Sequence, residues 1–156
     1  MREAIQALKN ASPVEPLLLS KGLCSAAQVH AADIAAKAIV SHEGSDGSRL
    51  HERVERECVW SGALGENIVF EESNELEAML IMLVEDGNAA RSHRKNLLNP
   101  EFRYVGVGAC PSDTLGYVLV INFGNDVREK GQLSVDAASE NKKRNQNDSL
   151  GENPNK

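Results

Sequence analysis

The stretch that decides the fold is ARSHRKNLLNPEFRYVGVGAC, residues 90–110. Its first half is polar and predicts a short helix with His93 in its first turn, which ends at Asn99-Pro100 because proline cannot continue a helix. The run YVGVGAC that follows predicts a strand, and GYVLVINFG at 116–124 predicts a second one. The five residues between them, PSDTL, are typical of a hairpin connection.

The residues before this stretch predict mainly helices. A short helix is expected at 2–10, and the segment ASPVEP, with Pro13 and Pro16, separates it from the next helix. A long Ala-rich helix is predicted from Leu23 to Val40 because apolar residues recur in steps of three and four. A short polar helix at 49–57 is expected to turn Leu50 and Val54 inward.

A strand is predicted at ENIVFE, residues 66–71, followed by a helix over ELEAMLIMLVED, residues 75–86. Asn74 and Glu77 have the spacing of a capping box that opens this helix. The helix is apolar on most sides and stops at Gly87, so we expect it to be buried. The whole order predicts an α+β fold, with helices on both faces of a sheet in a three-layer α-β-α sandwich. The last two strands are too close in sequence for a doubly wound parallel sheet.

The charge is uneven along the chain. The formal net charge of −6 is the sum of −7 over residues 1–127 and +1 over residues 128–156. An acidic body argues against sequence-independent binding of nucleic acid, which needs a basic face. The last 29 residues, 128–156, are polar and lack aromatic side chains, so we expect a disordered tail.

The compartment stays open at this stage. No apolar run reaches the length of a membrane span, and the first residues, MREAIQALKNASP, lack the apolar core of a secretory signal. Either the protein stays inside the cell or this chain lacks its export segment. Cys24, Cys58 and Cys110 allow at most one disulfide, and buried unpaired thiols are the simpler interpretation.

Four segments hold most of the unusual polar residues. His42 follows the Ala-rich helix, Glu66 opens a strand, Asp86 ends the apolar helix next to Glu85, and His93 opens the short helix. If the fold gathers them, two imidazoles face two carboxylates across a cleft. Such a set can bind a divalent cation such as zinc or relay protons. The spacing matches no local metal motif, so separate structural hydrogen bonds are the alternative.

Three motifs resemble one family. SHEGSDGSRLHERV, GALGENIVF and SHRKNLLNPEFRYVGVG are similar to the CAP superfamily of cysteine-rich secretory, antigen-five and pathogenesis-related-one proteins, and most to its bacterial and protist branch. The resemblance covers residues 2–124 and implies an SCP-like domain over 1–127, built as an α-β-α sandwich around a largely antiparallel sheet. It favours secretion, and it implies a possible sterol, lipid or protein ligand.

The resemblance also implies a shallow cleft of two histidines and two acids that holds a divalent metal in some members. Motif by motif, the histidines are His42 and His93 and the first acid is Glu66. Relatives often carry Trp-x-x-Glu at the end of the apolar helix. Leu83 in the place of the tryptophan makes Asp86 the second acid, with Glu85 as the alternative, and many bacterial relatives have no acid there.

The remaining polar residues are expected to be structural. His30 falls on the apolar stripe of the long helix and is predicted to be a core histidine, whereas His51 is predicted to be solvated. An exposed helix face is predicted from three cations, Arg91, Arg94 and Lys95. For Arg94 the alternative is an ion pair with a nearby acid. Trp60 is expected in the core, and Asn67 and Asn99 are expected to tie down loop backbone.

Three functions fit these residues. The first is a non-catalytic binding module for a divalent metal or a lipid, because the chain has no nucleophile turn, phosphate loop or dinucleotide fingerprint. The second is a hydrolase of peptides or esters in which the same histidines and acids activate water. The third is a purely structural interaction domain, with the cleft residues only stabilising loops.

Overall fold

The computed structural model describes residues 2–71, 75–85 and 89–130. These residues form five helices and a four-stranded sheet. The elements in chain order are α1 (Arg2–Asn10), β1 (Leu18–Leu19), α2 (Lys21–Lys37), α3 (Leu50–Glu57), β2 (Cys58–Glu71), α4 (Glu75–Val84), α5 (Ser92–Leu97), β3 (Tyr104–Ser112) and β4 (Gly116–Glu129). The predicted capping residue Asn74 and Gly87 lie outside the described residues.

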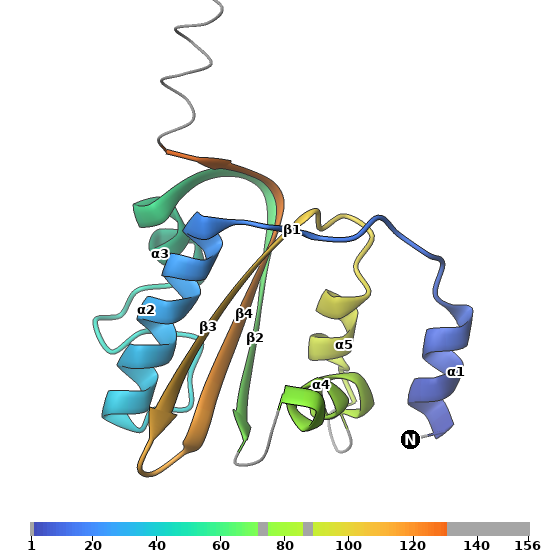
Figure 1. The fold of residues 1–156 in the computed structure, drawn as a ribbon, viewed down its shortest axis with the longest axis horizontal. Helices are drawn as coiled ribbons and strands as arrows, with labels where there is room; N and C mark the ends of the chain where they lie inside the picture. Colours follow the sequence, from blue (N-terminus) through green and yellow to red (C-terminus); the bar gives the residue numbers. More distant parts are fainter. Residues whose placement is uncertain (1, 72–74, 86–88, 131–156) are drawn as a thin grey trace, which may run out of the picture.

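The sheet has the strand order β1-β3-β4-β2. Strand β1 runs parallel to β3, and the other two pairings are antiparallel. Helices α2 and α3 cover one face, while α4 and α5 cover the other and α1 lies further out on that side (Figure 1). The structure therefore confirms the predicted α-β-α sandwich with a mostly antiparallel sheet.

The two faces of the sheet follow the alternation of side chains along β2 and β4. Ile68 and Val120 pack against the alanines and Ile34 of α2. Their chain neighbours Val69 and Ile121 pack on the opposite face, in a cluster that includes Met82 of α4. The same alternation sends Glu66 toward α2 and the next residue toward α4 and α5.

Strand β4 extends beyond the segment expected to be ordered. Arg128 and Glu129 pair with Val59 and Cys58 of β2, although both residues fall in the predicted tail. Glu129 also binds the start of α2, where it accepts hydrogen bonds from Ser20 Oγ (2.9 Å) and Gly22 N (3.0 Å). Residues 131–156, the rest of the predicted tail, lie outside the described residues.

The prediction that the helix at 75–86 is buried is wrong for α4. Only the stripe of Ala78 and Met82 faces the sheet, and both residues are buried. The other side exposes four apolar residues: Leu76, Met79, Leu80 and Ile81. A helix on the outer layer of a sandwich needs one apolar stripe, so the extra apolar residues reach the surface. None of the described helices has the length and apolar character that crossing a membrane requires.

The three cysteines are free thiols, as predicted, but only Cys58 is buried as the simpler interpretation of the sequence expected. Cys58 is buried against α3, and burial raises the pKa of its thiol to about 11. Cys24 and Cys110 are partly exposed. Trp60 packs at the edge of the cluster that contains Cys58 and is only partly buried.

Candidate functional site

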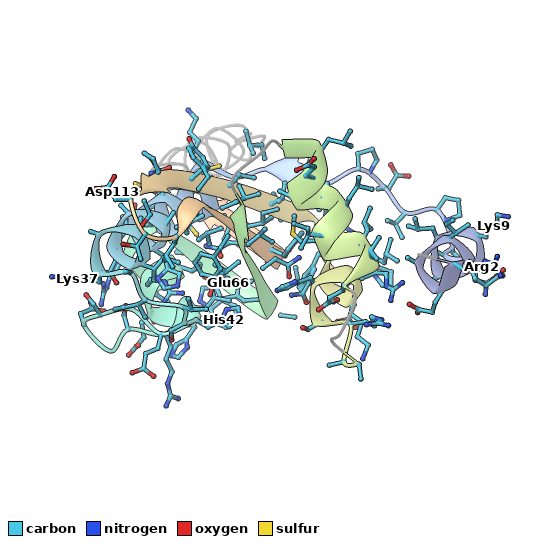
Figure 2. All side chains as sticks on the ribbon, turned by 90° about the horizontal axis from the view of Figure 1, so that it is seen from below. Arg2, Lys9, Lys37, His42, Glu66 and Asp113 are labelled. Carbon is cyan, nitrogen blue, oxygen red and sulfur yellow. The ribbon has the colours of Figure 1, made fainter. Side chains whose placement is uncertain are left out.

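The centre of the candidate site is the carboxylate of Glu66, which β2 holds on the α2 side of the sheet. Its side chain is 3% exposed. Oε1 lies 2.8 Å from Nδ1 of His42, and Oε2 accepts a hydrogen bond from Arg53 Nη2 at 2.8 Å. Figure 2 shows His42 and Glu66 side by side. The structure thus brings together the first histidine and the first acid predicted from the sequence.

Arg53 is a member of this site that the sequence analysis missed. It lies on α3 and is buried, with Nη1 donating to Ser48 O (2.7 Å) and Nη2 donating to His42 O (3.2 Å) as well as to Glu66. The sequence could have indicated that Arg53 is buried, because it follows Leu50 by three residues and precedes Val54. It therefore shares the stripe that was expected to face inward.

Asn122 completes the shell around Glu66, and it was also missed. It sits opposite Glu66 in the register of β2 and β4 and is fully buried. With its amide oriented to satisfy both of its polar atoms, Nδ2 donates to Glu66 Oε2 (3.1 Å) and the oxygen accepts from Ala27 N (3.3 Å). In the sequence, Asn122 could have been recognised as the lone polar residue within the apolar run VLVINF.

His30 is a core histidine, as predicted, and it also borders the site. It is fully buried, with Nε2 3.2 Å from Ser41 O and 3.9 Å from Glu66 Oε1. Desolvation lowers the pKa of His30 and outweighs the opposing effect of the Glu66 charge. His30 is therefore a neutral ring beside Glu66 at physiological pH.

His42 faces a cleft that opens to solvent. The cleft has a volume of about 360 Å³ and is lined by His42, Glu43, Arg49, Leu50, Leu64, Gly65 and Glu66. The side chain of His42 is 63% exposed, although Nδ1 is bound to a buried carboxylate. The ring is thus anchored on one edge and open to solvent on the rest.

The second predicted histidine, His93, pairs with Glu85. Its Nδ1 lies 3.7 Å from Glu85 Oε1, and the Glu85 carboxylate accepts hydrogen bonds from the backbone N–H of His93 (3.2 Å) and of Arg94 (3.3 Å). Glu85 itself has a left-handed backbone at the end of α4, with φ 49°. Side chain and backbone together fix this carboxylate at the start of α5.

One of the two candidate second acids, Glu85, contacts a histidine in the described structure, because its Oε1 lies 3.7 Å from Nδ1 of His93. Asp86, the first choice, lies outside the described residues and stays a prediction.

Two asparagines connect α5 to β2 beside Glu66. Asn67 Nδ2 donates to His93 O (3.0 Å), and Asn96 Nδ2 donates to Asn67 Oδ1 (2.8 Å) and to Glu66 O (3.3 Å). This confirms a structural role for Asn67. Asn99 has the expected role too, since its Oδ1 accepts from Glu101 N at 3.0 Å.

The two histidine–acid pairs approach β2 from different sides. Glu66 and His42 lie on the α2 side, whereas Asn67 points to the α4 and α5 side and holds the backbone of His93. Within residues 2–71, 75–85 and 89–130, no three side chains of His, Cys, Asp or Glu are grouped so that they could hold a metal ion. The sequence predicted one shared cleft, and the structure describes two neighbouring pairs.

The expectation of an exposed cationic face on α5 is wrong for Arg94. This residue is buried, and its Nη2 forms an ion pair with Glu3 of α1 at 2.9 Å. Glu3 also pairs with Arg91 (3.2 Å). The hydrogen bond and charge of Arg94 lower the pKa of Glu3. The ion pair weighed as the alternative for Arg94 is therefore confirmed.

Comparison with known proteins agrees with this fold and these motifs. The chain belongs to the CAP family, the cysteine-rich secretory protein family, whose model matches residues 2–123. An extracellular protein of Bacillus anthracis that contains an SCP domain has a similar structure, with a TM-score of 0.62 and 25% sequence identity. The match covers 81% of this chain and 40% of that protein, so this chain spans well under half of its length.

An outer surface protein of Borrelia burgdorferi shares the fold, with a TM-score of 0.57 and 16% identity over 78% of this chain and 84% of that one. A sequence search of curated proteins found no match. The family match and the Bacillus anthracis structure therefore establish an SCP-type domain, and the Borrelia structure shows the same fold.

Proposed function

We propose that this CAP domain is a non-catalytic binding module whose cleft takes a divalent cation such as zinc at His42. The observation that supports it most is the 2.8 Å contact between His42 Nδ1 and Glu66 on a ring that is 63% exposed. Histidines that bind metals usually have one ring nitrogen held by a carboxylate, which leaves the other nitrogen free to ligate. Zinc accepts such a neutral imidazole nitrogen.

The donor set fits a metal through the imidazoles rather than through the acids. Both oxygens of Glu66 already accept from protein donors, and Glu85 accepts from the backbone of α5. We assign His42 as the ligand in the cleft and give Glu66 the role of orienting it. His93, which Glu85 orients, is the second ligand that the sequence predicts, and the titration below tests whether it reaches the same ion. A metal held by one or two imidazoles takes its other ligands from solvent or from a bound molecule, so the expected affinity is modest.

The same geometry argues against Glu66 as the general base of a hydrolase. A general base needs a carboxylate or imidazole that is free to accept a proton from water. The Glu66 carboxylate is instead paired with a buried guanidinium and an amide. This arrangement supports an orienting role for Glu66 and argues against the carboxylate-dependent hydrolase considered above.

Zinc titration by isothermal calorimetry tests the metal site. His42→Ala is expected to abolish binding, and Glu66→Gln to weaken it by about 10–100-fold, the usual effect of losing an orienting partner. His93→Ala shows whether the second imidazole ligates the same ion. The control is His51→Ala, an exposed histidine outside the cleft. Equal zinc affinity in His42→Ala and the control would refute the site.

A lipid or sterol ligand is the second candidate, and the exposed face of α4 supports it. Leu76, Met79, Leu80 and Ile81 form an apolar surface on one helix, and such surfaces usually mark a contact with lipid or protein. We expect Leu80→Glu to reduce flotation with phosphatidylcholine–cholesterol vesicles. Val29→Glu is the matched control, because Val29 is exposed to a similar degree but lies on α2 across the sheet. Unchanged flotation of Leu80→Glu would remove this candidate.

We also infer an extracellular location. The support is the family, which is named for secretory proteins, and the extracellular SCP-domain protein of Bacillus anthracis with a similar structure.

A further inference from the structure

We propose that Arg53 is a positioning residue of this site: it fixes the ring of His42 with Nδ1–H toward Glu66 and the lone pair of Nε2 toward the cleft. The metal-binding role of the cleft is the proposed function on which the purpose of this arrangement rests. The arrangement itself is a property of the metal-free protein and can be measured without any ligand.

The two terminal nitrogens of Arg53 reach three acceptors on separate segments: Ser48 O and His42 O in the loop before α3, and Glu66 Oε2 on β2. One guanidinium therefore holds both the backbone of His42 and the carboxylate that its ring contacts. Its side chain is 3% exposed, so solvent cannot substitute for it.

Arg53 also balances the charge of Glu66. A buried carboxylate without a compensating charge tends to take up a proton. Arg53 supplies that charge at 2.8 Å from Oε2, and Asn122 donates to the same oxygen. As the anionic partner of this ion pair, the Glu66 carboxylate can only accept hydrogen bonds. At Oε1 the partner must therefore donate, which places the proton of His42 on Nδ1.

His30 is a second imidazole that could compete with His42 for Glu66 Oε1. His30 Nε2 lies 3.9 Å from Oε1, which is too far for a hydrogen bond, and 3.2 Å from the carbonyl of Ser41. A carbonyl only accepts, so His30 donates from Nε2 to Ser41 and leaves Oε1 to His42. Free neutral imidazole prefers the proton on Nε2, so the tautomer of His42 is the opposite of the default and needs a specific cause.

Nitrogen-15 NMR of the histidine rings measures the tautomer directly. In the metal-free wild-type protein we expect His42 to carry its proton mainly on Nδ1. Arg53→Gln removes the guanidinium that holds both the Glu66 carboxylate and the His42 backbone, and it is expected to move the population toward the Nε2–H form. Arg53→Lys keeps the charge but cannot bridge three acceptors, so an intermediate shift is expected. Arg56→Gln is the control, because Arg56 lies on the same helix in an exposed pair with Asp46.

The wild-type measurement decides the proposal even if the Arg53 variants fail to fold. A dominant Nε2–H form of His42 in the wild type would overturn it, and so would an unchanged tautomer in folded Arg53→Gln. Zinc titration of the same samples separates the two proposals. An Nδ1–H ring that binds no zinc would support the role of Arg53 and refute the metal site. With both correct, zinc affinity falls by about tenfold or more in Arg53→Gln.

Discussion

Replacing Glu66 with methionine is expected to lower the free energy of unfolding by about 3–5 kcal/mol, the range observed when one member of a buried ion pair is removed. Arg53 would remain buried with no anionic partner, and Asn122 would lose an acceptor inside the sheet. Urea denaturation followed by fluorescence of Trp60, the single tryptophan, measures the change.

The double variant Glu66→Met/Arg53→Met separates the loss of the ion pair from the cost of leaving a buried charge without a partner. Replacing both charges by apolar groups of similar volume is often close to neutral, so the double variant is expected to be more stable than Glu66→Met alone. Asp126→Asn is the surface control: it breaks an exposed pair with Arg128 and is expected to cost less than about 1 kcal/mol. A loss in Glu66→Met no larger than in this control would contradict the charge-balance argument.

The layers of the fold were predictable because local patterns and tertiary packing agree there. The hairpin at 104–129 has alternating strands and a short polar connection, and α2 has a continuous stripe of small apolar residues. In each of these segments the apolar residues fit only one periodicity, that of a strand in the hairpin and that of a helix in α2. The exposed face of α4 was not predictable in this way, because an apolar composition does not show which residues have a partner layer.

Only the site residues that lie in sequence motifs could be predicted. His42, Glu66 and His93 stand in recognisable segments, and the contact of the first two confirms that pairing. Arg53 and Asn122 come from a helix and a strand whose contacts with Glu66 span 13 and 56 positions. Only the register of β2 against β4 and the packing of α3 bring them together. Their one sequence signal was a polar residue at a position expected to be buried.

The same close packing that positions the site predicts a second large effect, at Gly108. A Cβ placed there would lie 2.2 Å from Gln28 N and 2.3 Å from Ala27 C, which are backbone atoms of α2. The helix cannot easily move away, because the Gln28 amide is bound to both backbone groups of Ala109 at 3.0 Å. Side chains yield to overpacking by changing rotamer, whereas two main chains do not.

Gly108→Ala is therefore expected to lower the free energy of unfolding by about 3 kcal/mol, the upper end of the usual cost of overpacking. The matched control is Val107→Ala on the same strand, whose side chain is substantially exposed and whose loss is expected to cost less than about 1 kcal/mol. Both are measured by the same denaturation assay. If Gly108→Ala were as stable as the control, α2 would have to sit further from β3 than described. The loop that carries His42 follows α2 directly, so the position of that ring beside Glu66 would then need to be redetermined.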